Sequence, residues 1–203
     1  ESHAWIEEYI ESIPVPIVFS AMEPREGIPS VTMDNYLGAT LAVQHLLDIG
    51  RKKIAHLPGP TLWWEAAERK RGWRDTLKKA GLEAPEQYCA EGNWSAKSGE
   101  TAFLQILENC PDMDAIFVGN DQMALSVFRE ARRLNIRVPE QLAVVGFDDI
   151  SDAAYFCPSL STISQNLQRI GELSVEMAVE MIQSNQESLS FIAEPRFVSP
   201  TLV

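Results

Sequence analysis

Two polar pairs follow apolar segments of the kind that form buried strands. Asn120-Asp121 come directly after "AIFVG", and Asp148-Asp149 come directly after "LAVVGF". Parallel strands of an open sheet point their carboxyl ends to one edge, where ligands bind. Both pairs are therefore expected on one rim, together with Pro58-Gly59 after "KIAHL". Such a rim can hold magnesium for phosphoryl chemistry or accept hydrogen bonds from the hydroxyl groups of a neutral ligand.

Ordinary structural roles compete with a binding role at each pair. Asp121 can cap the helix that follows it, and Asp148-Asp149 can simply turn the chain. For one pair alone the structural role is favoured. Two polar pairs on one rim favour a site.

Enzyme motifs are scarce. The sequence contains no G-x-S-x-G, G-x-x-x-x-G-K-[ST] or H-E-x-x-H motif, and no G-x-G-x-x-G after a strand. A magnesium site would also need a lysine or threonine at another strand end, which the rim does not clearly supply. The cysteines and histidines lack the spacing of disulfide frameworks or metal sites; they are Cys89, Cys110, Cys157, His3, His45 and His56. We expect reduced thiols and no catalytic residue, metal or cofactor.

The elements that must position the rim alternate between strand and helix. "KIAHL", "AIFVG" and "LAVVGF" are expected as buried strands. Four amphipathic helices lie between and around them: one from Asp34 to Gly50, one from Glu65 to Gly81, one capped by Ser95 and one capped by Asp121. A short extended piece is expected in "QYCAEGNW". This alternation predicts an α/β fold, with a parallel sheet over about residues 35–160 flanked by helices on both sides.

The two flanks of this region differ from it. "HAWIEEYIESI" is expected to be helical and "IPVPIVFS" to be a strand, and "LSTISQ" leads into a long helix that starts near Leu167. Neither flank has enough strands for a domain of its own. We interpret them as parts of a second, incomplete lobe.

Composition limits the partners of this 203-residue chain. Lys and Arg number 17 against 29 Asp and Glu, a net charge of −12, which is the wrong sign for neutralising DNA phosphates. No apolar run approaches the roughly 20 residues that span a membrane. The opening segment lacks the basic and apolar regions of a signal peptide, so a cytoplasmic protein is expected.

Six segments carry a resemblance to the lactose-repressor family of bacterial transcription regulators. They are "VTMDNYLGATLAVQHLLDIGRKKIAHLPGP", "ERKRGW", "EGNWSAKSGETA", "VGNDQMAL", "IRVPEQLAVVGFDDI" and "CPSLSTISQ". "GNWSAKSG" and "NDQMAL" look most like the member that gives the family its name. The order and spacing agree across nearly the whole chain, so this similarity is far more specific than any single motif.

The resemblance implies a two-lobe fold like that of periplasmic sugar-binding proteins, closing on a small effector. It implies a partial N-terminal lobe at 1–33 and 162–193, and a C-terminal lobe at 34–161 and 194–203. The chain would cross between lobes at Met33 to Asn35, near Ser161 to Gln165, and at Glu194 to Phe197. The family's helix-turn-helix headpiece is not in this sequence, which therefore resembles an internal fragment of a longer repressor.

Ligand-binding roles carry over by position. The residues are Arg69, Trp94, Asn120, Asp148, Gln165 and Trp63. Arg69 would donate hydrogen bonds to ligand oxygens, Asp148 would accept them, and Trp94 would pack on the apolar face of a sugar. Asn120 can donate and accept toward hydroxyls, and Gln165 would face the cleft. As alternatives, Arg69 would only form a salt bridge and Trp94 would only pack in the core.

Three residues in two segments depart from the family pattern. Leu167 stands where the member that gives the family its name has an aromatic residue. This difference argues against the same sugar preference as in that member. Trp63 and Trp64 follow "GPTL" where relatives usually carry small residues. An exposed aromatic pair there indicates a larger, stacked glycoside, and surface or dimer packing explains it about equally well.

The resemblance implies a sugar-responsive transcription regulator, and a repressor is expected. This chain would be its effector-binding and dimerisation core, controlling operator binding allosterically as a homodimer or tetramer without membrane contact. The rim has donors, acceptors and an aromatic face but no cluster of basic residues, so a neutral mono- or disaccharide is expected. The alternative is a sugar-binding receptor of a transport system, which would share the fold but normally carry a leader.

Overall fold

The computed structural model describes residues 13, 15–186 and 194–203, in two compact units. Unit 1 comprises the described residues of Glu1–Met33 and Asn166–Val198, and unit 2 comprises Asp34–Gln165 and Ser199–Val203. The helix expected over residues 3–13 lies outside the described residues, except for residue 13.

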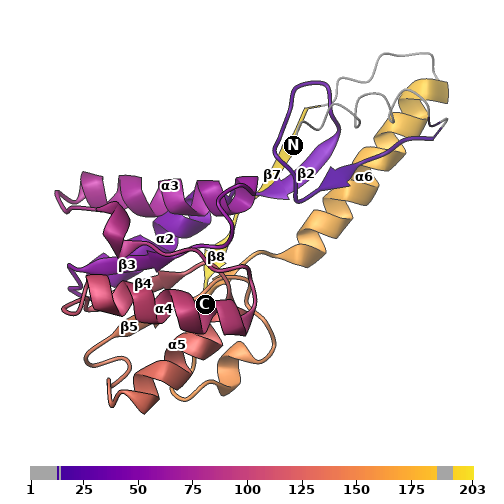
Figure 1. Ribbon diagram of the computed structural model, residues 1–203. Helices are drawn as coiled ribbons and strands as arrows, with labels where there is room; N and C mark the ends of the chain where they lie inside the picture. The colour runs from indigo at the N-terminus through magenta and orange to yellow at the C-terminus, as the bar shows by residue number, and fades with distance from the viewer. Residues whose placement is uncertain (1–12, 14, 187–193) are drawn as a thin grey trace. The chain divides into compact units, whose positions relative to one another are not determined.

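Unit 2 is built on a parallel sheet of three buried strands, β3 (Ile54–Leu57), β4 (Ala115–Val118) and β5 (Ala143–Val145), in the order β3-β4-β5. Its helices are α2 (Asn35–Asp48), α3 (Trp64–Lys79), α4 (Ala96–Asn109) and α5 (Asp121–Arg133). Helices α2 and α3 cover one face of the sheet, and α4 and α5 cover the other (Figure 1). The predicted α/β fold with helices on both faces of a parallel sheet is confirmed.

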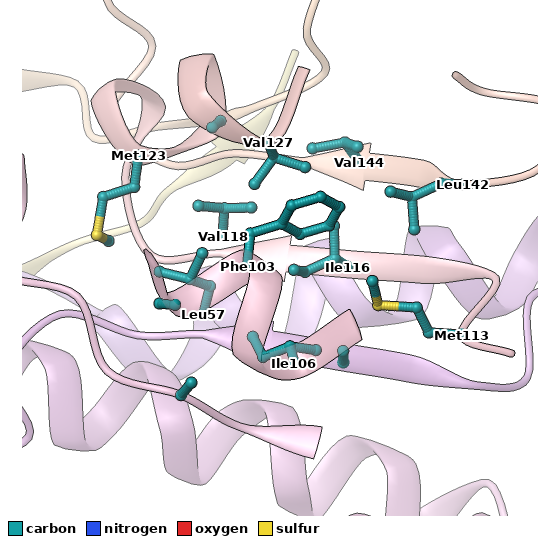
Figure 2. Packing of buried hydrophobic residues seen from close by; sticks show 14 of the residues in the cluster. Leu57, Phe103, Ile106, Met113, Ile116, Val118, Met123, Val127, Leu142 and Val144 are labelled. Atoms are coloured by element: carbon teal, nitrogen blue, oxygen red, sulfur yellow. The ribbon is translucent and has the colours of Figure 1, made fainter. Parts of the chain in front are cut away.

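The core of unit 2 fills both faces of this sheet. On the α4 and α5 side, Phe103 and Val127 pack against strand residues that include Ile116 and Val118, as Figure 2 shows. On the other side the indole of Trp73 is fully buried and donates a hydrogen bond to the carbonyl of Ile54 at 3.0 Å. The strands read as continuous apolar runs because both faces are covered.

Two of the three predicted helix N-caps are confirmed. The Asp34 carboxylate accepts from the Leu37 N–H at 2.8 Å, and the Ser95 hydroxyl accepts from the Ser98 N–H at 3.2 Å. The prediction that Asp121 caps its helix is wrong. The preceding residue, Asn120, caps α5 instead, accepting from the Met123 N–H at 2.9 Å.

The segment between α3 and α4 is less regular than expected. A short 3-10 helix, η1 (Glu86–Tyr88), takes up the start of the predicted extended piece, and only Cys89 forms a single parallel bridge, to His56. A second 3-10 helix, η2 (Ala153–Tyr155), follows β5. Strands β6 (Ile163–Ser164) and β8 (Thr201–Leu202) pair antiparallel.

Unit 1 contains β1 (Phe19–Ser20), β2 (Ser30–Met33), β7 (Arg196–Val198) and the long helix α6 (Leu167–Gln186). The strands form a parallel sheet in the order β1-β2-β7. The strand expected in "IPVPIVFS" is reduced to its last two residues, and β2 was not predicted. Among the described residues of this unit, Val31, Met177 and Val198 form a small buried cluster.

Strand pairing sets the boundaries between the units, and they differ from the expected ones. Residues 162–165 belong to unit 2, because β6 pairs with β8 and the Asp148 N–H donates to the Ile163 carbonyl at 2.9 Å. Residues 194–198 belong to unit 1, because β7 pairs with β2. No helix among the described residues is long and apolar enough to cross a membrane.

Candidate functional site

The carboxyl ends of β3, β4 and β5 bring the predicted polar residues to one edge of the unit 2 sheet. In the register, Leu57 pairs with Val118 and Phe117 with Val145, so the three strands end together. Pro58-Gly59, Asn120 and Asp148 follow at this edge. The rim expected from the sequence therefore lies within one unit.

Arg69 lies at this edge on the inner face of α3 and is only 5% exposed. Its Nε donates to Asn35 Oδ1 at 2.8 Å and its Nη1 donates to the Gly119 carbonyl at 2.6 Å. The guanidinium carbon lies 3.6 Å from the centre of the Phe147 ring. These contacts hold the guanidinium plane in one orientation, which favours directed hydrogen bonding to a ligand.

Asp148 lies beside Arg69 and leaves hydrogen-bonding capacity unused. Its Oδ1 lies 3.6 Å from Arg69 Nη1 and accepts from Gln165 Nε2 at 2.5 Å. Within the described residues, Asp148 Oδ2 and Arg69 Nη2 take part in no hydrogen bond. Nη2 is not fully buried, so a ligand can reach it. Arg69 and Asp148 thus lie side by side, and each has one side-chain atom free to bind a ligand.

Burial sets the electrostatics of this pair. Desolvation lowers the pKa of Arg69 to about 10, against the opposing effect of Asp148, so the guanidinium stays charged at neutral pH. Desolvation also raises the pKa of Asp148 to about 6, although Arg69 and the hydrogen bond from Gln165 favour its ionised form. At pH 7 the pair consists of a cation and a carboxylate, and protonation of Asp148 begins close to neutrality.

Asp121 supports the turn that carries Asp148. This buried carboxylate accepts from the Phe147 N–H at 2.8 Å, the Ile150 N–H at 3.0 Å and the Thr162 hydroxyl at 2.7 Å. Desolvation raises its pKa. Asp148 has a φ of 113° and Asp149 a φ of 56°, conformations uncommon for residues other than glycine. The three bonds to Asp121 hold this strained turn in place.

Close packing of Gly146 against Asp121 also holds this carboxylate in place. A Cβ atom on Gly146 would lie 2.2 Å from Asp121 Oδ1, so only glycine fits beside the carboxylate. Asp121 is therefore a positioning residue, whereas the sequence assigned it to a cap.

Trp94 and Asn120 form the next part of the site. Asn120 Nδ2 donates to the Trp94 carbonyl at 3.0 Å while its Oδ1 caps α5, so both ends of the Asn120 amide are engaged within the protein. The Trp94 ring is half-buried, packs against the core and covers Gly59, where a Cβ would lie 2.2 Å from it. The Arg69 guanidinium lies 5.6 Å from the centre of the Trp94 ring.

Trp63 completes the set. Its ring centre lies 6.3 Å from that of Trp94 with the planes at 62°, and the residue is 57% exposed. The structure thus joins all six predicted residues through direct contacts within unit 2, although their role toward a ligand stays a prediction.

Sequence reasoning missed three residues that orient the site: Asn35, Phe147 and Thr162. Asn35 followed a helix cap and Phe147 ended an apolar strand, so each had a sufficient structural explanation. Only the fold brings them against Arg69 and Asp121. Among the described residues no group of three or more His, Cys, Asp or Glu side chains could hold a metal ion.

Comparisons with known proteins agree on one kind of relative. A family model described as a periplasmic binding protein-like domain matches residues 43–203. The ribose operon repressor of Escherichia coli (strain K12) is 35% identical over 184 residues, which cover 90% of this chain and 56% of the repressor. The chain spans about half the length of the curated relatives it matches.

Solved structures give the same result. The complex of the transcriptional regulator CelR with cellobiose aligns with a TM-score of 0.89 at 29% identity, over 98% of this chain and 60% of CelR. The lac repressor dimer bound to operator and the anti-inducer ONPF aligns with a TM-score of 0.86 at 30% identity, over 98% of this chain and 67% of the repressor. These relatives are transcription regulators and not enzymes.

Proposed function

Because this chain belongs to the periplasmic-binding-protein-like domain family and matches the effector-binding core of lactose-repressor-family regulators, we propose that it binds a neutral sugar or glycoside as the effector of a transcription regulator. Binding of that effector controls the affinity of the whole protein for operator DNA. A sugar-binding transport receptor is less well supported, since the relatives are regulators.

The class of ligand is inferred from the free donor of Arg69 and the free acceptor of the neighbouring Asp148. A hydroxyl group both donates and accepts, so one sugar hydroxyl, or two neighbouring ones, can satisfy both atoms. The cation and the carboxylate cancel, so the pair favours an uncharged ligand over a sugar phosphate. The half-buried Trp94 ring supplies an apolar surface next to this polar pair, and CelR is a relative that binds a disaccharide.

The other parts of the function follow from this proposal. The acidic chain does not supply the DNA contact, which we assign to a headpiece outside it. The protein acts as a homodimer or tetramer in the cytoplasm, where its operator lies, and it catalyses no reaction.

Calorimetry on the intact protein tests the ligand class. The panel consists of neutral mono- and disaccharides, the matching sugar phosphates, and purine bases as flat aromatic competitors. We expect saturable binding of at least one neutral sugar. Binding confined to phosphorylated sugars or to purines would overturn the proposal.

Operator binding tests the regulatory role. Asp148→Asn removes the carboxylate charge with little change in shape, so it should leave operator affinity near normal while weakening the response to effector by roughly 10- to 100-fold in concentration. Asp149→Asn is the matched control, because Asp149 is an exposed neighbour on the same turn. The measurement is operator affinity at fixed salt over a series of effector concentrations. An unchanged response in Asp148→Asn would place the site elsewhere.

A further inference from the structure

We propose that Trp63 forms, with Trp94, a second subsite that holds the second ring of a disaccharide or an aryl glycoside. The inference rests on the proposed function, in which Arg69 and Asp148 bind the hydroxyls of the first ring. It assigns Trp63 as a specificity-determining residue that distinguishes two-ring glycosides from monosaccharides.

Within the described residues, the ring contact of the Trp63 indole is with Trp94. Trp63 occupies the N-cap position of α3, where an indole, which has no hydrogen-bond acceptor, cannot cap the helix. The residue is 57% exposed, and its ring meets Trp94 at 62°, an edge contact that does not stack the two faces. An aromatic face exposed in this way can hold the C–H face of a sugar ring or an aromatic aglycone.

The two loops that carry Trp63 and Trp94 are tied together. The Gly92 N–H donates to the Pro58 carbonyl at 2.8 Å, and Thr61 donates to the Glu91 carboxylate through both its N–H and its hydroxyl. The Trp94 ring covers Gly59 on the first of these loops. The aromatic pair is therefore in place before a ligand arrives, which reduces the ordering cost of binding.

The order of the groups fits a ligand of two rings. The Arg69 guanidinium lies 5.6 Å from the Trp94 ring centre, and the Trp63 ring centre lies 6.3 Å from the same Trp94 centre. Trp94 is therefore near both the polar group of Arg69 and the indole of Trp63. A first ring bonded to Arg69 and Asp148 lies next to Trp94, and the group attached to it reaches Trp63.

The experiment compares glycosides that share their first ring. Calorimetry measures the binding of methyl glycosides, phenyl glycosides and disaccharides of glucose, galactose and xylose to the intact wild-type protein and to three variants. Trp63→Ala removes the indole, and Trp63→Phe keeps an aromatic ring. Leu62→Ala is the matched control, because Leu62 is the adjacent residue and is 98% exposed. Thermal unfolding confirms that each variant is folded.

For the sugar that binds, wild type should prefer the two-ring ligand over the methyl glycoside by about tenfold, as expected for one aromatic stacking contact. Trp63→Ala should abolish that preference, because the affinity for the two-ring ligand should fall much more than the affinity for the methyl glycoside. Trp63→Phe should retain part of the preference, and Leu62→Ala all of it. Preserved preference in Trp63→Ala overturns this inference alone and leaves Trp63 as a surface for protein packing. A protein that binds no glycoside overturns the proposed function and this inference together.

Discussion

The described residues of the two units differ in how completely they bury apolar side chains. In unit 2, strands covered on both faces and four helices enclose large fully buried residues that include Trp73, Phe103 and Phe117. In the described part of unit 1, one helix packs on a three-stranded sheet around Val31, Met177 and Val198. Helix α6 also leaves apolar residues exposed, namely Leu167, Val175, Val179 and Ile182.

This difference places stability and the candidate site in the same unit. All six candidate ligand residues, and the carboxylate of Asp121 that supports their turn, lie in unit 2. A site that binds through oriented hydrogen bonds needs groups held by a well-packed core. Among the described residues, unit 1 buries fewer apolar side chains than unit 2, so we expect it to open at lower free energy.

The largest expected effect is that of Phe103→Ala. The ring is fully buried between α4 and the sheet, so its removal should lower the free energy of unfolding of unit 2 by about 3–5 kcal/mol. The matched change in unit 1, Met177→Ala, should raise the hydrogen exchange of β2 and α6 and leave the amides of β3, β4 and β5 protected. Equal loss of protection in both units after Met177→Ala would mean that they unfold as one.

Asp121→Ala should also affect unit 2 strongly. It leaves two backbone N–H groups and the Thr162 hydroxyl without their acceptor, at a cost of about 3 kcal/mol. Because the turn that carries Asp148 loosens, effector affinity should fall even at temperatures where the variant is folded. Asp152→Ala, an exposed carboxylate nearby, is the control for chemical denaturation and calorimetry. A normal affinity in folded Asp121→Ala would show that the turn needs no such support.

The pH dependence of effector binding should reflect Asp148. Its pKa is raised to about 6, so the carboxylate acceptor is present above pH 7 and is lost as the pH falls through about 6. Affinity should be constant above pH 7 and should decrease below pH 6 by at most about tenfold per pH unit. Asp148→Asn should bind weakly at every pH. A wild-type affinity that is unchanged between pH 5 and pH 8 would contradict the role of this carboxylate.

The contribution of Asp148 to stability should change with pH in the opposite direction to effector affinity. A folded-state pKa above the unfolded value means that the folded protein binds the proton more tightly, so the contribution of Asp148 becomes less favourable as the pH rises from about 4 to about 6. Loss of affinity at low pH is therefore distinguishable from acid unfolding.

The smallest expected effect is that of Val175→Ala. Val175 is 65% exposed on α6, so the change should alter stability by less than about 0.5 kcal/mol. Val127→Ala, the same change at a fully buried position of α5, should cost about 2 kcal/mol. Both are measured by chemical denaturation, and equal costs would mean that α6 is as well packed as α5.

Much of the fold of unit 2 could be predicted from the sequence, because its signals are local. Continuous apolar runs marked β3, β4 and β5, and Asp34 and Ser95 marked helix starts through hydrogen bonds to residues three positions away. Local sequence signals did not identify the N-cap of α5, because two adjacent residues could serve as that cap. Asn120 and Asp121 are both good caps, and the choice between them depended on the distant partners of Asp121.

Unit boundaries were harder to predict for a similar reason. Residues 162–165 and 194–198 form short strands, and a short strand is assigned by its partner and not by its own pattern. The partners lie far away in the sequence, so only the folded chain shows to which unit each segment belongs.

The sequence by itself determined the fold of unit 2 and the identities of the candidate ligand residues, through apolar periodicity and the resemblance to a known family. Tertiary structure decided how those residues act. Arg69 and Lys70 flank the apolar stripe of α3 about equally, yet Arg69 is buried against Phe147 while Lys70 binds the exposed Glu86 at 2.8 Å. One helical position is a rotation of about 100°, and only the neighbouring strand ends determine which of two adjacent cations faces the carboxylate of Asp148.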